Sequence, residues 1–235
     1  MSEVIKVSNL YKKYGTVVAL HNVNLKIKKG EIVGICGPNG SGKSTFLRIL
    51  SGIVKPTTGY VEILGGVAGR KARKHIAYVS ENDIYYKWMK IGELLSFLRS
   101  FYPSFDYEKA KMLLEDEGLD LNKKVGELSK GYRQRLKVIM AISNSPEVIL
   151  LDEPFSGIDM LSRERILNIL KEFLIGAEKT ALISSHFVEG IEEIFSRVIF
   201  FKEGNVVLDE DCEAMREKYG KSVKSMYFEV FGGLS

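Results

Sequence analysis

The N-terminal part of the chain alternates between apolar and polar side chains. Residues 3–15 read EVIKVSNLYKKYG, residues 18–31 read VALHNVNLKIKKGE, and residues 59–64 read GYVEIL. A period of two places the apolar side chains on one face of a strand, which is typical of half-buried antiparallel strands. We therefore predict an antiparallel β subdomain near the N-terminus.

Several later runs are short and mostly apolar, as in the buried strands of a parallel sheet. They lie at 31–37, 75–81, 148–154 and 180–186. Residues 43–52 and 163–174 instead carry apolar side chains at helical spacing. Residues 197–209 indicate a hairpin with Gly204 and Asn205 in the turn.

Residues 82–127 have a different character. Within them, IGELLSFLRSFY at 91–102 and DYEKAKMLLEDEGL at 106–119 carry apolar side chains at i, i+3 and i+4 with charges between them. Alternating strands and helices in the rest of the chain favour an α/β fold with a mostly parallel sheet. We predict one domain over residues 1–235. It contains an inserted α-helical subdomain at about 82–130 and a small C-terminal element at about 205–235.

Composition narrows the class of protein without defining it. The chain has 235 residues, a formal net charge of +4 and two cysteines. The cysteines provide no disulfide framework, so a reducing compartment is expected. The N-terminus has no signal-peptide pattern, and no run reaches the roughly 18 apolar residues of a membrane-spanning helix. Any membrane role therefore requires a partner protein.

The sequence GPNGSGKST at 37–45 matches a phosphate-binding loop, with a predicted strand before it and a predicted helix after it. Its glycines allow sharp turns that direct backbone N–H groups at a phosphate, and Lys43 and Ser44 supply a cation and a Mg²⁺ ligand. An ordinary glycine-rich turn is the alternative. The candidate nucleotide-binding residues are Gly37, Pro38, Asn39, Gly40, Ser41, Gly42, Lys43, Ser44 and Thr45.

Two further predicted strands end in chemically active side chains. VILLDEP ends with Asp152 and Glu153, and TALISSH ends with His186. The carboxyl ends of strands are where α/β sheets bind ligands. Asp152 is a candidate Mg²⁺ ligand, and Glu153 is a candidate base for polarising a water molecule. The alternatives are a pair of acids in a loop and a structural histidine.

The stretch LSKGYRQRLK at 128–137 is open to two interpretations. Ser129 and Gly131 occur where a helix would begin, so the stretch could be an ordinary helix cap. A hydroxyl beside free backbone N–H groups at a helix start can also hold an anion. It could therefore form half of a phosphate site.

Taken together and in order, GPNGSGKST, LSKGYRQR, VILLDEP, SGID and SSH resemble the nucleotide-binding subunit of an ABC transporter. The resemblance covers about residues 14–205. It implies a P-loop ATPase core that uses ATP and Mg²⁺. It also implies that Tyr14 stacks on adenine, that Glu81 lies near Mg²⁺, and that Asp159 belongs to a loop at the dimer interface.

The resemblance further implies an assembly. Ser129, Lys130 and Gly131 fall in the signature loop, which in this family faces ATP bound to a second subunit. The partners would be a second copy or a related ATPase subunit, and an integral membrane permease contacting about residues 82–100. ATP hydrolysis in the closed dimer would then drive transport at the cytoplasmic face of the membrane.

Three positions depart from the family pattern. Glu81 replaces a glutamine, Lys130 replaces a glycine, and Tyr132 replaces a second glutamine. The first two departures and the stretch FYPSFD at 101–106 are similar to a branch of exporter-type ATPases with separate membrane partners. The resemblance therefore implies export, whereas the transported substrate would be selected by the permease.

The segment 84–95 crowds Tyr85, Tyr86, Trp88 and Met89 into one short region. Such residues are enriched at interfaces, so they could grip a helix of a membrane protein. Packing within the helical subdomain is the alternative.

Other functional classes fit less well. A soluble ABC ATPase acting on nucleic acid or ribosomes would usually have two cassettes or a long coiled coil, and the chain has one cassette, no sustained heptads and a small net charge. A P-loop kinase or switch GTPase would leave the signature stretch and His186 without a role. We therefore predict no nucleic-acid partner.

Overall fold

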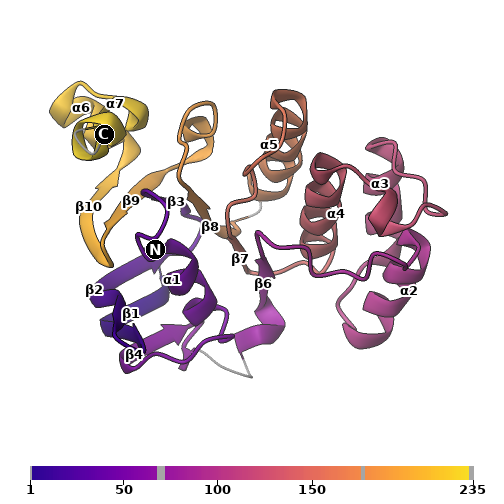
Figure 1. The fold of residues 1–235 in the computed structure, drawn as a ribbon, viewed down its shortest axis with the longest axis horizontal. Coiled ribbons are helices and arrows are strands. Elements are labelled where there is room, and N and C mark those ends of the chain that lie inside the picture. Colours follow the sequence, from indigo (N-terminus) through magenta and orange to yellow (C-terminus); the bar gives the residue numbers. More distant parts are fainter. Residues whose placement is uncertain (1, 68–71, 176–177, 233–235) are drawn as a thin grey trace.

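Two β-sheets form the framework of the protein (Figure 1). The computed structural model describes residues 2–67, 72–175 and 178–232. A four-stranded sheet has the order β2-β1-β4-β5, and a six-stranded sheet has the order β10-β9-β3-β8-β7-β6. The strands are β1 Glu3–Tyr14, β2 Val17–Lys28, β3 Ile32–Cys36, β4 Thr58–Ile63, β5 Gly66–Val67, β6 Ile76–Val79, β7 Val148–Leu151, β8 Thr180–Ser185, β9 Arg197–Lys202 and β10 Asn205–Asp211.

The six-stranded sheet is parallel except at one edge. β3, β6, β7, β8 and β9 run in the same direction, and only β10 is antiparallel, paired with β9. Every residue of β7 and β8 is buried. Sheets covered on both faces need such continuous apolar runs, so the predicted α/β class is confirmed.

The four-stranded sheet is antiparallel throughout, as the alternating pattern predicts. Its apolar face and helix α1 pack against one face of the parallel sheet. Leu20 from β2, Phe46 from α1 and Leu150 from β7 are wholly buried in that core. Ile149 of β7 points into a second core on the other face of the sheet, because successive side chains of a strand alternate.

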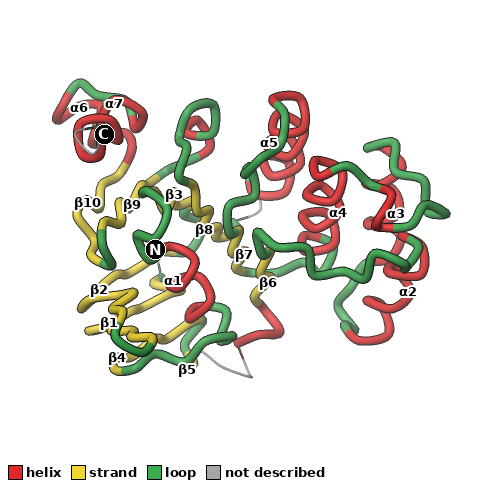
Figure 2. The backbone as a smooth tube through the Cα atoms, in the orientation of Figure 1, coloured by secondary structure: helices red, strands yellow, loops and turns green. Residues whose placement is uncertain are grey.

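Apart from α1, which packs into the first core, the helices contribute side chains to the second core (Figure 2). The helices are α1 Lys43–Leu50, α2 Ile91–Phe101, α3 Tyr107–Asp116, α4 Lys130–Ile142, α5 Met160–Leu174, α6 Cys212–Tyr219 and α7 Val223–Phe231, with 3₁₀ turns at Ala72–His75, Val125–Glu127 and Glu192–Ile194. Within the described residues, every helix is too short or too polar to cross a membrane.

Residues 82–90 lie ahead of α2 as loop and turn. Two local expectations need correction. α5 begins at Met160, three residues before the predicted start, because Asp159 caps it by accepting a hydrogen bond from the Ser162 N–H at 2.8 Å. The hairpin turn is formed by Glu203 and Gly204, which both have positive φ, and Asn205 already belongs to β10.

Candidate active site

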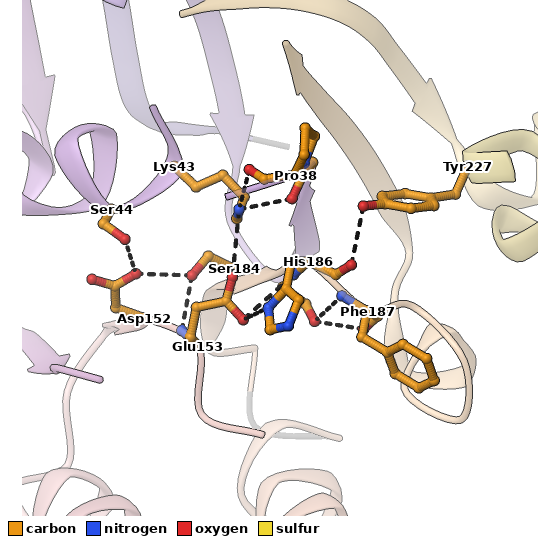
Figure 3. A network of polar contacts seen from close by, with 11 residues as sticks. Pro38, Lys43, Ser44, Asp152, Glu153, Ser184, His186, Phe187 and Tyr227 are labelled. Carbon is orange, nitrogen blue, oxygen red and sulfur yellow. Dashed lines mark hydrogen bonds and ion pairs between the residues drawn. The ribbon is translucent and has the colours of Figure 1, made fainter. Parts of the chain in front are cut away.

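The candidate site residues lie at one edge of the sheet, directly after the carboxyl ends of three neighbouring parallel strands. β3 leads into the phosphate loop, β7 leads to Asp152 and Glu153, and β8 leads to His186. β8 lies between β3 and β7 in the sheet, so the three carboxyl ends are adjacent. The strand-end prediction is therefore correct for these residues, whose side chains Figure 3 shows converging.

The glycines of the phosphate loop let the chain pass very close to its neighbours. Gly42 has φ of 106°, and a Cβ atom there would stand 2.5 Å from the Ala19 carbonyl oxygen. A Cβ at Gly37, where φ is 155°, would overlap the Phe201 carbonyl oxygen. A side chain at either position would be strained and would also collide with backbone. Both glycines are thus needed for the loop to close onto the sheet.

Lys43, the first residue of α1, lies inside the loop that precedes it. Its Nζ donates to the carbonyl oxygens of Gly37 at 2.7 Å and Pro38 at 3.0 Å. The same atom lies 3.4 Å from Oε1 of Glu153, and the two side chains are only 4% and 7% exposed. This buried cation therefore stands between the loop that would surround a phosphate and the acid at the end of β7.

Asp152 is completely buried and accepts three hydrogen bonds. Its Oδ1 accepts from Ser44 Oγ at 2.7 Å and from Ser184 Oγ at 3.0 Å, and its Oδ2 accepts from the Tyr78 hydroxyl at 2.9 Å. Burial, followed by the charge of Asp152, raises the pKa of Tyr78 to about 12, so Tyr78 remains a donor at physiological pH. The carboxylate is held rigidly beside the hydroxyl of the phosphate-loop serine.

Glu153 has a backbone conformation that is uncommon for a residue with a side chain. Its φ is 49°, and its N–H donates to Ser184 Oγ at 2.9 Å. Such backbone strain is kept where the surrounding structure enforces it, which is frequently at functional sites. Oε2 meets His186 Nδ1 at 2.8 Å, whereas the buried Oε1 has no hydrogen-bond donor among the described residues.

A small hollow of about 210 Å³ lies beside this pair of residues. Glu153, His186 and Phe187 are among its lining residues. A larger hollow of about 1280 Å³ lies elsewhere, and residues of α1, of β6 and of the loops before and after α2 line it. Glu153 and His186 thus border the small hollow, which has room for a few water molecules or a phosphate group.

Comparison with known proteins identifies the family. The family described as "ABC transporter" matches residues 20–156, the greater part of the chain. The chain belongs to the ATP-binding subunits of ABC transporters. It is therefore an ATP-binding protein and an ATPase.

Relatives that are similar over nearly the whole chain agree with this family. The Nod factor export ATP-binding protein I of Rhizobium sp. is 33% identical, over 99% of this chain and 78% of that protein. The phosphonates import ATP-binding protein PhnC of Wolinella succinogenes is 30% identical, over 93% of this chain and 89% of that protein. A dimeric structure of the ATP-binding cassette MJ0796, in a post-hydrolysis state with ADP and Pi, matches with a TM-score of 0.79 and 31% identity over 88% of this chain and 98% of that chain.

In this ABC ATPase the residues predicted to form the signature loop lie at the start of helix α4. Ser129 is the N-cap, and its Oγ accepts from the Tyr132 N–H at 3.4 Å. Gly131 is buried against α5, where a Cβ atom would overlap the Ser162 hydroxyl, and the Lys130 ammonium lies against Gly157. The interpretation as a helix cap is therefore confirmed. Binding of a second phosphate by the same residues remains a prediction.

Two predicted residues of the ATPase lie apart from the buried cluster. Tyr14 ends β1 with 46% of its surface exposed, and the Lys12 ammonium lies 4.7 Å from its ring centre. Glu81 is exposed, and its backbone carbonyl accepts from Lys137 at 3.0 Å. Among the described residues, no hydrogen bond or ion pair joins the Glu81 carboxylate to Asp152 or Ser44. Its role as a metal ligand remains a prediction.

The structure adds residues that sequence patterns did not single out. Ser184 bridges the two acids by donating to Asp152 and accepting from Glu153, and Tyr78 supports Asp152 from β6. Lys137 holds the loop after β6 by donating to three of its carbonyl oxygens. Ser184 could have been noticed from its place two residues before His186. Tyr78 and Lys137 carry no local signal, because their partners are distant in sequence.

Proposed function

We propose that this ABC ATPase hydrolyses ATP with Mg²⁺ in a closed dimer and so drives transport through a separate membrane permease. The observation that carries the proposal is the cluster at three adjacent strand ends, in which buried Lys43, Asp152 and Glu153 meet the partly exposed Ser44 and His186. In it, a phosphate-binding cation, a pair of metal-binding oxygens and a base occur together. Residues 37–45 would enclose the phosphates of ATP, with Tyr14 against the adenine.

The side chains of Ser44 and Asp152 fit a Mg²⁺ ion. Both present oxygen atoms, only 2.7 Å apart, and Mg²⁺ is commonly bound by one or two carboxylates together with substrate phosphates. When bound, Mg²⁺ would neutralise charge that develops on the phosphates. Ser184 and Tyr78 would keep Asp152 oriented toward it. We include Glu81 as a third ligand, which requires its exposed side chain to turn inward when ATP binds.

Glu153 and His186 would handle the attacking water. Oε1 of Glu153 accepts no hydrogen bond from the described residues and is 3.4 Å from the Lys43 ammonium. It would therefore be available to accept a proton from water once Lys43 moves toward the phosphates of bound ATP. His186, at 2.8 Å from Oε2, would orient the carboxylate and approach the γ-phosphate. Both act from rigid strand ends, which limits the reorganisation needed during the reaction.

The second half of the phosphate site would come from another subunit. Ser129 and Lys130 are exposed at the start of α4, whose N-terminus carries a partial positive charge. A dimer in which these residues approach the ATP of a second copy, or of a related ATPase subunit, would close around two nucleotides. Asp159, beside the same helix start, would lie at that interface. The dimeric cassette among the similar structures supports this arrangement.

The permease would bind at the groove of about 1280 Å³ and along about residues 82–100. Ile84, Phe101 and Tyr102 line the groove, and all three have about half or more of their surface exposed. Such an apolar groove suits a short amphipathic helix of a membrane protein. This ATPase would then lie at the cytoplasmic face of the membrane. Co-purification from membranes, with identification of the bound integral protein, tests the partner.

Export is the direction that we propose. It rests on Glu81, on Lys130 and on the stretch 101–106, which are similar to an exporter-type branch. A Nod factor export relative is in keeping with it, although a phosphonates import relative is comparably similar. Transport measured in inside-out and right-side-out vesicles that contain the co-purified permease tests the direction.

Replacing Glu153 by glutamine tests the catalytic proposal. We expect Glu153→Gln to lower the ATP hydrolysis rate at least about 100-fold, because the amide cannot accept the proton. ATP binding should remain, and the variant should accumulate as an ATP-bound dimer that size-exclusion chromatography detects. Hydrolysis at the parental rate would remove Glu153 from this role.

Glu147→Gln is the matched control. Glu147 precedes the same strand at its opposite end, and its exposed carboxylate pairs with His75 at 2.8 Å. The chemical change is identical, but the site is remote from the phosphate loop. We expect the parental hydrolysis rate from this variant.

A further inference from the structure

The C-terminal helix α7 contacts the loop that carries His186. The Tyr227 hydroxyl donates a hydrogen bond to the backbone carbonyl oxygen of His186 at 3.0 Å (Figure 3). His186 and Tyr227 are 41 residues apart in the chain. The C-terminal element is thereby joined directly to the residue that faces Glu153.

The ring of Tyr227 is fixed by other aromatic side chains. Its centre lies 5.8 Å from the Phe200 ring of β9 and 4.6 Å from the Phe231 ring of α7. Phe200 is completely buried in the sheet. The hydroxyl is therefore presented from a rigid position that the central sheet determines.

A second residue of α7 holds the same loop further along. The Lys224 N–H donates to the Glu192 carboxylate at 2.9 Å, and the Lys224 ammonium pairs with Glu189 at 2.6 Å. The ion pair is exposed and contributes little energy by itself. Together the contacts tie the loop to α7 at its beginning, at His186, and near its end.

The hydroxyl of Tyr227 remains a donor over the working pH range. Burial, followed by the charges of Cys36 and Glu153, raises the pKa of Tyr227 to about 12. The hydrogen bond to His186 therefore does not titrate near neutral pH.

We propose that Tyr227 is a positioning residue for ATP hydrolysis, which holds the backbone of His186 where the imidazole meets Glu153. The proposal rests on the roles given above to Glu153 and His186. Loss of the hydroxyl would free the His186 carbonyl and allow the loop to shift. Displacements of about 1 Å at a reacting centre can cost up to about 100-fold in rate. Because the loop keeps its contacts to Lys224, we expect a smaller loss.

Tyr227→Phe removes only the hydroxyl and keeps the ring contacts. We expect kcat for ATP hydrolysis to fall about three- to ten-fold. The KM for ATP and the thermal unfolding midpoint should stay near the parental values, because the phosphate loop and the aromatic packing are intact. A purely structural role would instead lower the unfolding midpoint and reduce activity only in proportion to the folded fraction.

Tyr219→Phe is the matched control in the same C-terminal element. The Tyr219 hydroxyl lies 3.4 Å from Glu210, at the surface and away from the site. We expect this variant to retain the parental kcat. Equal losses in the two variants would overturn the proposal.

Parallel assays of Glu153→Gln and His186→Ala distinguish a failure of the proposed active site from a failure of the proposed role of Tyr227. If both lose hydrolysis and Tyr227→Phe keeps the parental kcat, the role of Tyr227 is wrong and the proposed active site stands. If His186→Ala and Glu153→Gln keep the parental kcat, the catalytic proposal fails and the role of Tyr227 fails with it. A selective loss of kcat in Tyr227→Phe, with both active-site variants impaired, supports the inference.

Discussion

Two helix starts in this ATPase carry glycine, serine and lysine, and their surroundings differ completely. Lys43 at the start of α1 is buried among its own loop carbonyls and Glu153. Ser129 and Lys130 at the start of α4 are exposed, and Ser129 makes the hydrogen bond of an ordinary cap. The first site is assembled within one chain from three strand ends. The second is exposed at Ser129 and Lys130, and in the proposed dimer another subunit would complete it.

Mixing two inactive variants tests whether the start of α1 in one subunit and the start of α4 in another serve the same nucleotide. This experiment has the largest expected effect. Lys43→Ala removes the cation of the phosphate loop, and Ser129→Arg obstructs the exposed helix start. We expect each variant alone to lose hydrolysis at least about 100-fold, since phosphate positioning is the main contribution to this chemistry. In a mixture, half of the pairs combine both variants and retain one intact composite site, so about a quarter of the parental activity should return.

Hydrolysis by the mixture is compared with that of each variant at the same total concentration. A mixture that stays as inactive as its components would show that the two helix starts do not serve one shared nucleotide. Refolding the mixed chains together before the assay allows the subunits to exchange.

A substitution at Gly131 tests how tightly the second helix start is packed within its own chain. A Cβ atom there would overlap the Ser162 hydroxyl, so Gly131→Ala should displace the start of α4. We expect the free energy of unfolding to fall by about 1–3 kcal/mol, as for other overpacked sites. Urea unfolding measures the loss.

Adding Ser162→Gly to Gly131→Ala should recover part of that stability, because it removes the atoms that collide. Failure of the double variant to improve on Gly131→Ala would mean that the contact with α5 is not the cause. The single variant Ser162→Gly is the reference for the loss of the Asp159–Ser162 hydrogen bond between side chains.

The smallest expected effect is on how the free energy of unfolding depends on pH. It concerns Lys137 of α4, which donates hydrogen bonds to the loop after β6. Burial, the largest influence, lowers the pKa of Lys137 from 10.5 to about 8. Between these two values the unfolded chain binds more protons at this lysine than the folded chain does, so its contribution makes folding more favourable as the pH rises. Lys137→Met should lack this contribution. The gain in unfolding free energy from pH 8 to pH 10 should therefore be larger in the parental protein, by urea unfolding, and equal slopes would contradict the assignment.

Patterns of apolar residues were sufficient to predict the sheets and the strand ends. β1 and β2 largely alternate, whereas β7 and β8 are mostly apolar and buried along their whole length, and both patterns follow from how many faces of a strand are buried. The phosphate loop, Asp152, Glu153 and His186 follow from motif and strand position together. These features depend on local sequence, which is why one chain is enough to find them.

Contacts between distant segments were not predictable in this way. Tyr78 and Tyr227 reach the site from β6 and α7, and nothing near them in sequence marks their partners. In the aromatic segment 84–95, packing and exposure both occur. Tyr85 packs against the core, as expected of a structural residue, whereas Trp88 is 65% exposed and stacks on Tyr86, as a residue that binds a partner could. The conformation of the loop before α2 decides which of these aromatic side chains is buried. The periodicity of apolar residues does not predict that conformation.

Tyr78 belongs both to the large groove and to the hydrogen bonds of Asp152. It is one of the residues that line the groove, and its hydroxyl donates to Asp152 at 2.9 Å. Arg48, another lining residue, comes within 3.5 Å of the same hydroxyl. Tyr78 thus joins the lining of the large groove to the buried carboxylate of Asp152 through one hydrogen bond. In the proposed complex, a permease segment bound in this groove would contact a side chain that is itself hydrogen-bonded to the proposed Mg²⁺ ligand.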